Sequence, residues 1–149
     1  MTDTSDRRPP KIALVFPSSD QCVQSLFVYH KNHAIGHKPP QSTLILATYL
    51  KAMGFDDVTC IDAQLEGYSP EQTAEAVAAL APDIVGVTAW TDFWYPTWRT
   101  MKLVREKLPD CTIVAGGPHC SVYPQETVEH SEADYVVAGD GEDVLLNIV

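Results

Sequence analysis

The sequence predicts a doubly wound α/β domain, in which helices cover both faces of a parallel β-sheet. Short apolar runs alternate along the chain with segments of helical pattern, as in βαβ units. The apolar runs are uniform and do not alternate with polar residues, which is typical of strands buried on both faces. The chain has 149 residues, the length of one domain with its own core.

Five runs rich in β-branched residues and bounded by turn formers are the predicted strands: Lys11–Phe16, Val58–Ile61, Asp83–Thr88, Cys111–Ala115 and Asp134–Ala138. Right-handed crossovers between them favour the flavodoxin-like strand order 2-1-3-4-5 in a three-layer α/β/α arrangement. The switch point of that order lies between strands one and three. A ligand is therefore expected in the crevice at the carboxyl ends of the strands.

Three helices are predicted, over Gln41–Met53, near Pro70–Leu80 and from about Tyr95 to Leu108. The first follows Pro39-Pro40 and ends before a glycine. The second has Ser69 as its N-cap and a proline at its first position. The side chains expected to face the core are Leu44, Ala47 and Leu50; Ala74, Val77 and Ala78; and Trp98, Met101, Val104 and Leu108.

Composition excludes several classes of function. The formal net charge is −10 with only ten Lys and Arg residues and no basic run, which argues against nucleic acid or an anionic membrane as a partner. No apolar run approaches the roughly 18 residues of a membrane helix, and residues 1–10 are polar, so we expect a disordered tail on a soluble, cytoplasmic protein. The cysteines lack the spacing of a zinc or iron–sulfur site and are expected to be reduced thiols: Cys22, Cys60, Cys111 and Cys120.

The connection between the first strand and the first helix is unusually long, at some two dozen residues. It contains His30, His33 and His37, which could suggest a metal site. The nearest carboxylate and thiol, Asp20 and Cys22, are separated from them by an apolar stretch, so metal binding is disfavoured and no metal ligand is predicted.

Three further loops follow strands three, four and five. Gly116-Gly117-Pro118-His119 would let a planar or phosphate-bearing group approach the backbone, although a tight strand-to-helix turn explains the glycines equally well. Thr88-Ala89-Trp90-Thr91, followed by Asp92-Phe93-Trp94-Tyr95, suits a flat ligand or a hydrophobic cap over the sheet edge. Gly139-Asp140-Gly141-Glu142 opens a helix, where carboxylates complement the dipole.

Five motifs in this order and spacing resemble one family. They are Pro39-Pro40 with Leu44, Ala47-Thr48-Tyr49-Leu50 and Gly54; Ile61-Asp62-Ala63; Pro82 to Ala89; Gly116 to His119; and Gly139 to Glu142. Together they look like the N-terminal cobalamin-binding domain of cobalamin-dependent radical S-adenosylmethionine enzymes, which include methyltransferases and the anaerobic magnesium-protoporphyrin monomethyl ester cyclase. The resemblance covers residues 11–149.

The resemblance implies cobalamin as the cofactor, with the glycine pair making room for its nucleotide tail and Thr88-Ala89-Trp90 standing where the family has Ser-x-Leu. The implied cofactor-binding residues are Ser18, Ser19, Cys22, Thr88, Ala89, Trp90, Thr91, Gly116, Gly117, Pro118, His119, Gly139, Asp140, Gly141 and Glu142.

Cobalamin proteins of the methionine-synthase type carry Asp-x-His-x-x-Gly in the first loop, and the histidine ligates cobalt. Here the loop reads Asp20-Gln21-Cys22-Val23-Gln24-Ser25, without the histidine or the glycine. A base-off site without a histidine ligand is therefore expected, with easier reduction to Co(I).

The radical chemistry is expected outside this chain, which has no CxxxCxxC motif and no predicted catalytic residue. By resemblance, a truncated C-terminus would lead into a radical S-adenosylmethionine barrel carrying a 4Fe–4S cluster and S-adenosylmethionine. The whole enzyme would perform methyl transfer or oxidative cyclisation. Two other classes remain: a receiver-like interaction domain, which would need a phosphoacceptor Asp where Thr88 ends strand three, and a nucleotide or flavin binder, which would need a glycine-rich loop after strand one.

Overall fold

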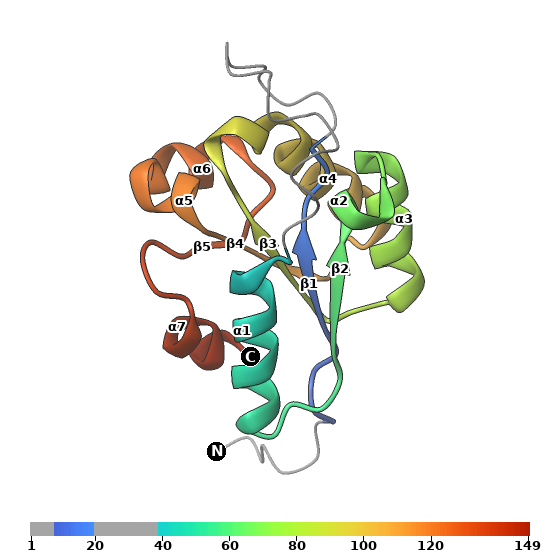
Figure 1. Ribbon diagram of the computed structural model, residues 1–149, viewed down its shortest axis with the longest axis vertical. Coiled ribbons are helices and arrows are strands. Elements are labelled where there is room, and N and C mark those ends of the chain that lie inside the picture. Colours follow the sequence, from blue (N-terminus) through green and yellow to red (C-terminus); the bar gives the residue numbers. More distant parts are fainter. Residues whose placement is uncertain (1–7, 20–38) are drawn as a thin grey trace.

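The computed structural model describes residues 8–19 and 39–149 of the chain. These residues form a five-stranded sheet with the order β2-β1-β3-β4-β5, in which every pair is parallel (Figure 1). The strands are β1 (Ile12–Phe16), β2 (Val58–Asp62), β3 (Ile84–Thr88), β4 (Thr112–Gly116) and β5 (Tyr135–Val136). The predicted fold class and strand order are confirmed.

Helices cover both faces of the sheet (Figure 1). They are α1 (Gln41–Ala52), α2 (Ala63–Glu66), α3 (Pro70–Leu80), the 3₁₀ turn η2 (Thr91–Phe93), α4 (Trp94–Lys107), α5 (Pro118–Val122), α6 (Pro124–His130) and α7 (Glu142–Ile148). Side chains that alternate along each strand divide the core into two clusters. One cluster packs against α1 and α7, and the other against α3 and α4.

Strand β5 is shorter than predicted, at two residues instead of the five of Asp134–Ala138. The Val137 N–H still donates to the Ala115 carbonyl at 2.8 Å, but Gly139 then turns the chain away with a φ of +88°. At this edge of the sheet Tyr135 is 51% exposed. The early end of β5 leaves the loop from Gly139 free to border a cavity.

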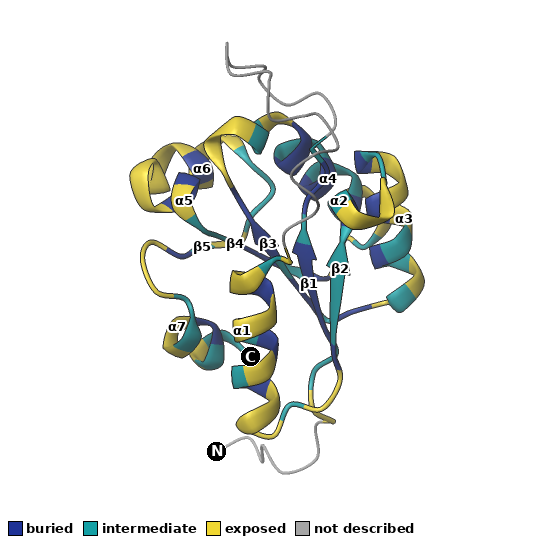
Figure 2. Ribbon diagram, viewed as in Figure 1, coloured by how far each residue is buried: buried dark blue, intermediate teal, exposed yellow. Residues whose placement is uncertain are grey.

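The buried face of α1 differs from the predicted one. Leu44 was expected to face the core but is 44% exposed, whereas Thr43, Ala47 and Leu50 are buried. Ala47 and Leu50 are thus buried as predicted, and the difference is confined to the start of the helix, where Thr43 is buried in place of Leu44, about 100° around the helix axis. Figure 2 shows the exposed residues along the outer side of α1. The burial of Thr43 brings a hydroxyl to the sheet, 3.4 Å from that of Thr88.

The other two predicted helices form largely as expected. Ser69 caps α3 through a capping box with Gln72, whose N–H donates to the Ser69 Oγ at 3.2 Å. The expected core residues of α3 are buried or half-buried. In α4, Met101 and Val104 are buried as predicted, and Trp98 and Leu108 are half-buried at the edges of the helix face.

Two carboxylates fix the strand starts at the edge of the sheet away from the loops described above. Asp83 accepts a hydrogen bond from the Lys11 N–H at 2.7 Å, and Asp134 accepts one from the Ile113 N–H at 2.7 Å. Arg105 also donates to Asp134, at 2.6 Å. Because each carboxylate binds a backbone N–H at the start of a neighbouring strand, it holds the register of that pair.

In the part of the chain that the structure describes, no helix combines the length and the apolar character needed to cross a membrane.

Candidate functional site

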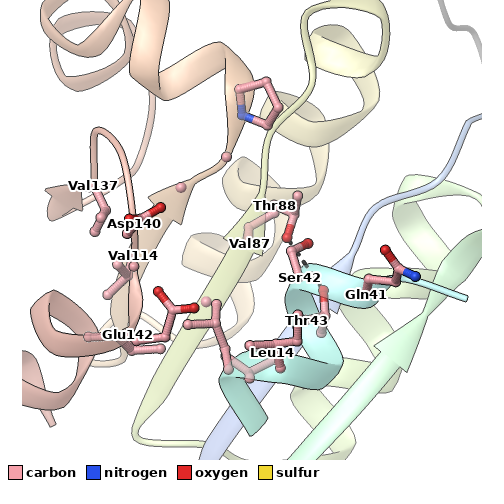
Figure 3. A pocket seen from close by; sticks show the side chains of 18 of the residues that line it. Leu14, Gln41, Ser42, Thr43, Val87, Thr88, Val114, Val137, Asp140 and Glu142 are labelled. Carbon is pink, nitrogen blue, oxygen red and sulfur yellow. Dashed lines mark hydrogen bonds between the residues drawn. The ribbon is translucent and has the colours of Figure 1, made fainter. Parts of the chain in front are cut away.

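A cavity of about 400 Å³ opens between α1, the start of α7 and the carboxyl ends of β3 and β4 (Figure 3). It lies at the sheet edge where the strand order predicts a ligand. Its volume falls within the range of small-molecule and cofactor sites. The apolar part of its lining includes Leu14, Val87, Val114, Val137 and Leu145.

Glycines form an unusual share of the cavity wall. Of the eight glycines in the chain, five line it: Gly86, Gly116, Gly117, Gly139 and Gly141. A Cβ on Gly116, which lines the cavity, would lie 3.8 Å from the Cβ of Val137, an ordinary van der Waals contact without a clash. Backbone is therefore exposed to a ligand where other residues would present side chains.

The polar groups of the cavity lie on opposite sides. Figure 3 shows Ser42, Thr43 and Thr88 on one side and the carboxylates of Asp140 and Glu142 on the other. The hydroxyls of Thr43 and Thr88 are buried and lie 3.4 Å apart. The lining residues in the described part of the chain include no Lys, Arg or His.

Hydrogen bonds join the three loops that border the cavity. The Ala89 N–H donates to the Gly116 carbonyl at 2.7 Å, and the His119 N–H donates to the Ala89 carbonyl at 3.0 Å. The Ser121 hydroxyl donates to the Gly117 carbonyl at 3.2 Å and accepts from the Gly139 N–H at 3.0 Å. The wall is therefore tied together before any ligand binds.

Gly117 serves the turn more than the cavity. Its φ is +100°, and a Cβ there would lie 2.9 Å from the Ala89 carbonyl oxygen. The sequence left two explanations for the pair Gly116-Gly117, a tight turn or the close approach of a ligand to the backbone, and each applies to one of the two glycines. Gly117 is required by the turn, and Gly116 presents backbone without a side chain to the cavity.

His119 points away from the cavity and is 4% exposed. Its ring stacks on Trp94 with centroids 4.2 Å apart, and Tyr123 packs on it at 5.4 Å. The Nδ1 atom lies 3.3 Å from the Thr91 hydroxyl, whereas the buried Nε2 has no partner among the described residues. Desolvation by burial lowers the pKa of His119 below its ordinary value.

This burial predicts a pH dependence of stability. Because the folded protein binds a proton at His119 less readily than the unfolded chain does, the neutral ring favours folding above the ordinary pKa of about 6.5. We expect the unfolding free energy to fall as the pH drops below that value, until the folded-state pKa is passed. Denaturant unfolding across this range should show a smaller fall for His119→Phe, which keeps an aromatic ring on Trp94. His130→Gln, at an exposed histidine, serves as the control and should show the same pH dependence of the unfolding free energy as wild type. If His119→Phe also shows the wild-type pH dependence, the dependence does not come from His119.

The residues implied by the resemblance divide into four groups. Those that line the cavity are Thr88, Trp90, Gly116, Gly117, Pro118, Gly139, Asp140, Gly141 and Glu142. Behind its wall lie Ala89 and His119, with Thr91 beside the His119 ring. Ser18 and Ser19 border a separate polar hollow with Gln64 and Tyr68. Cys22 and the three loop histidines lie outside the described residues.

The sequence did not predict that α1 and the interiors of the strands contribute residues to the cavity wall. The missed lining residues include Gln41, Ser42, Thr43, Leu46 and Gly86. A glycine within an otherwise β-branched strand was an available signal for Gly86, since such a glycine often marks a close approach. Ser121, which joins two loops, had no signal in the sequence.

The described cysteines show no sign of reactivity. Burial raises the pKa of the Cys120 thiol to about 11 and raises those of Cys60 and Cys111. Within residues 8–19 and 39–149, no group of three His, Cys, Asp or Glu side chains could hold a metal ion.

The family model described as the B12 binding domain matches residues 34–149, most of the chain. The chain belongs to the B12-binding domain family. The resemblance to cobalamin-binding domains stated from the motifs is therefore confirmed, and the cavity is the candidate site of a B12-binding domain.

Three relatives resemble this B12-binding domain. The anaerobic magnesium-protoporphyrin IX monomethyl ester cyclase of Rubrivivax gelatinosus is 42% identical over 81% of this chain. The enzyme of that name from Cereibacter sphaeroides is 36% identical over 81%, and an uncharacterized methyltransferase of Pyrococcus horikoshii is 29% identical over 89%. The matches span 22%, 20% and 27% of these relatives, so the domain corresponds to about a quarter or less of each.

Proposed function

We propose that this B12-binding domain holds the nucleotide tail of cobalamin in the cavity between α1, α7 and the sheet. The observation that carries the proposal is the glycine-lined wall at the carboxyl ends of β3 and β4. The corrin would then lie outside the strand ends, over the loops that begin at Ala89, Gly116 and Gly139.

The lining fits the chemistry of such a tail. A planar base suits the apolar floor around Leu14, Val114 and Val137, and the lack of a side chain at Gly116 leaves room for it. The first turn of α1 supplies hydrogen-bond donors for the polar part of the tail. Its helix begins after Pro40 without a side-chain cap, and the Ser42 and Thr43 side chains line the cavity.

We propose further that cobalamin binds base-off and without a histidine ligand. A tail base enclosed in the cavity cannot also ligate cobalt. His119 is stacked on Trp94 behind the cavity wall, and the first loop lacks the Asp-x-His-x-x-Gly motif. Cobalamin supplies the alkyl-transfer or redox chemistry, while the residues of this chain bind and orient it and exclude water from the tail.

The whole protein is proposed to be a radical S-adenosylmethionine enzyme, with the 4Fe–4S cluster and S-adenosylmethionine bound outside this domain. The proposal rests on the motif resemblance and on relatives several times longer than the matched region. Oxidative cyclisation is favoured over methyl transfer, because the two relatives named as cyclases are 42% and 36% identical and the one named as a methyltransferase is 29% identical.

The test is a titration of the purified chain with hydroxocobalamin, followed by absorption spectra. We expect binding with a base-off spectrum. Cobinamide, which lacks the nucleotide tail, is expected to bind at least about tenfold more weakly. A base-on spectrum, or equal affinities for the two corrinoids, would contradict a tail held in the cavity. Binding of neither would overturn the proposed function.

A further inference from the structure

Among the described residues that line the cavity, the only buried polar side chains are those of two threonines. Thr43 of α1 is 1% exposed, and Thr88 at the end of β3 is 8% exposed (Figure 3). Their hydroxyl oxygens lie 3.4 Å apart, which is longer than the usual distance of about 2.8 Å between hydrogen-bonded hydroxyls. Neither hydroxyl has a hydrogen bond with any other described residue.

The other buried threonines of the described residues are bonded differently. Each donates its hydroxyl proton to the backbone carbonyl four residues earlier and needs no further acceptor; they are Thr73, Thr97, Thr100 and Thr127. Thr43 and Thr88 have a proton each, and their only acceptors in the described part of the chain are each other's oxygens. When one hydroxyl donates to the other, one proton at the cavity wall is left without an acceptor.

The surroundings of this threonine pair are apolar. Leu14, Val114, Val137 and Leu145 line the same cavity and belong to the core cluster that packs against α1 and α7. The remaining polar side chains of the described lining are exposed or partly exposed. Because a donor without an acceptor is unfavourable in an apolar environment, the pair fits a ligand that brings one acceptor atom on an otherwise apolar group.

The benzimidazole base of a cobalamin tail has this composition. One ring nitrogen ligates cobalt in the base-on form and has no partner in the base-off form. The other ring nitrogen is bonded to the ribose and accepts no hydrogen bond, and the rest of the base is hydrocarbon. In the cavity, the free nitrogen and the free proton of the threonine pair would satisfy each other.

We propose that Thr43 and Thr88 together select the class of tail base, by donating one hydrogen bond to a base that has a free ring nitrogen. The domain is thereby specific for benzimidazole corrinoids over corrinoids with a phenolic base. This inference rests on the proposed function. The motifs that carry the family resemblance include Thr88 but not Thr43, so α1 supplies a specificity-determining residue that the resemblance does not name.

The experiment compares hydroxocobalamin with the hydroxo form of p-cresolylcobamide, whose phenolic base has no ring nitrogen. The phenolic base never ligates cobalt, whereas base-off binding of cobalamin breaks a cobalt–nitrogen bond, so the two wild-type affinities differ for this reason also. The informative quantity is therefore the change in the dissociation constant that a variant causes with each corrinoid. Quenching of tryptophan fluorescence measures it.

The double variant Thr43→Val and Thr88→Val replaces both hydroxyls by methyl groups. It is expected to bind hydroxocobalamin about fivefold or more weakly than wild type, while its affinity for the phenolic corrinoid changes by less than about twofold. Each single variant should lose less than the double variant, because the remaining hydroxyl keeps a proton for the ring nitrogen. Thr73→Val, at a buried threonine of α3 outside the cavity, is the matched control and should leave both affinities unchanged.

Binding of the phenolic corrinoid also shows that the double variant is folded. The proposal is overturned if the double variant loses affinity for both corrinoids equally, or if it binds hydroxocobalamin as wild type does. A full loss in Thr88→Val alone also overturns it, because Thr43 would then take no part in the selection. In each of these outcomes wild type still binds cobalamin, so the proposed function stands. Failure of wild type to bind either corrinoid would overturn the proposed function and this inference with it.

Discussion

Replacement of Gly117 by alanine is expected to lower the unfolding free energy by about 3–5 kcal/mol. The φ of +100° by itself strains a residue with a Cβ, at a cost of about 1–3 kcal/mol. The new Cβ would also lie 2.9 Å from the oxygen and 3.2 Å from the nitrogen of Ala89. Both atoms are held by hydrogen bonds, to the His119 N–H and the Gly116 carbonyl. Relief of the contact would break these bonds, at about 1 kcal/mol each.

Gly139→Ala separates the conformational cost of the positive φ from the cost of the contact with Ala89. Gly139 also has a positive φ, +88°, but a Cβ there would meet no atom within 4 Å. It should therefore show the conformational cost alone, about 1–2 kcal/mol. Denaturant unfolding of both variants measures the difference. Equal losses would show that contact with Ala89 contributes nothing and that the two loops can separate freely.

Gly116→Leu is expected to weaken cobalamin binding by at least about 100-fold while leaving the fold intact. A side chain at this position enters the cavity, where the nearest atom to a Cβ is that of Val137 at 3.8 Å. Because the Cβ would make only an ordinary van der Waals contact with Val137 and the rest of the leucine would enter the cavity, the unfolding free energy should stay within about 1 kcal/mol of wild type. Gly116→Ala, which adds one methyl group, should cause a smaller loss of affinity.

The measurement is the dissociation constant of hydroxocobalamin, with thermal unfolding of each variant as the check on folding. Thr48→Leu adds the same side chain on the exposed face of α1, outside the cavity, and should bind as wild type does. Wild-type affinity in Gly116→Leu would show that the nucleotide tail lies elsewhere. That result would contradict the proposed binding of the tail in the cavity, but it would leave the membership in the B12-binding domain family unaffected.

The sequence by itself determined the architecture, because the local signals all agreed. Uniformly apolar runs could be stable only as strands covered on both faces. Ser69 with Pro70 marked the start of α3, and the spacing of the glycine motifs placed the loops after strands three to five. The loops were thereby expected at one edge of the sheet, and nine of the residues named from them line the cavity.

The tertiary structure decided which side chains reach that cavity. Packing of α1 against the sheet buries Thr43 in place of Leu44, although both residues fit the helical pattern of the sequence. Burial of His119 against Trp94 depends on α4 and α5 meeting above β3 and β4, which no local pattern records. The same reason separates Glu142 from Asp143. Two adjacent carboxylates are equivalent in a helix's first turn until α1 places Tyr49 beside one of them and the cavity beside the other.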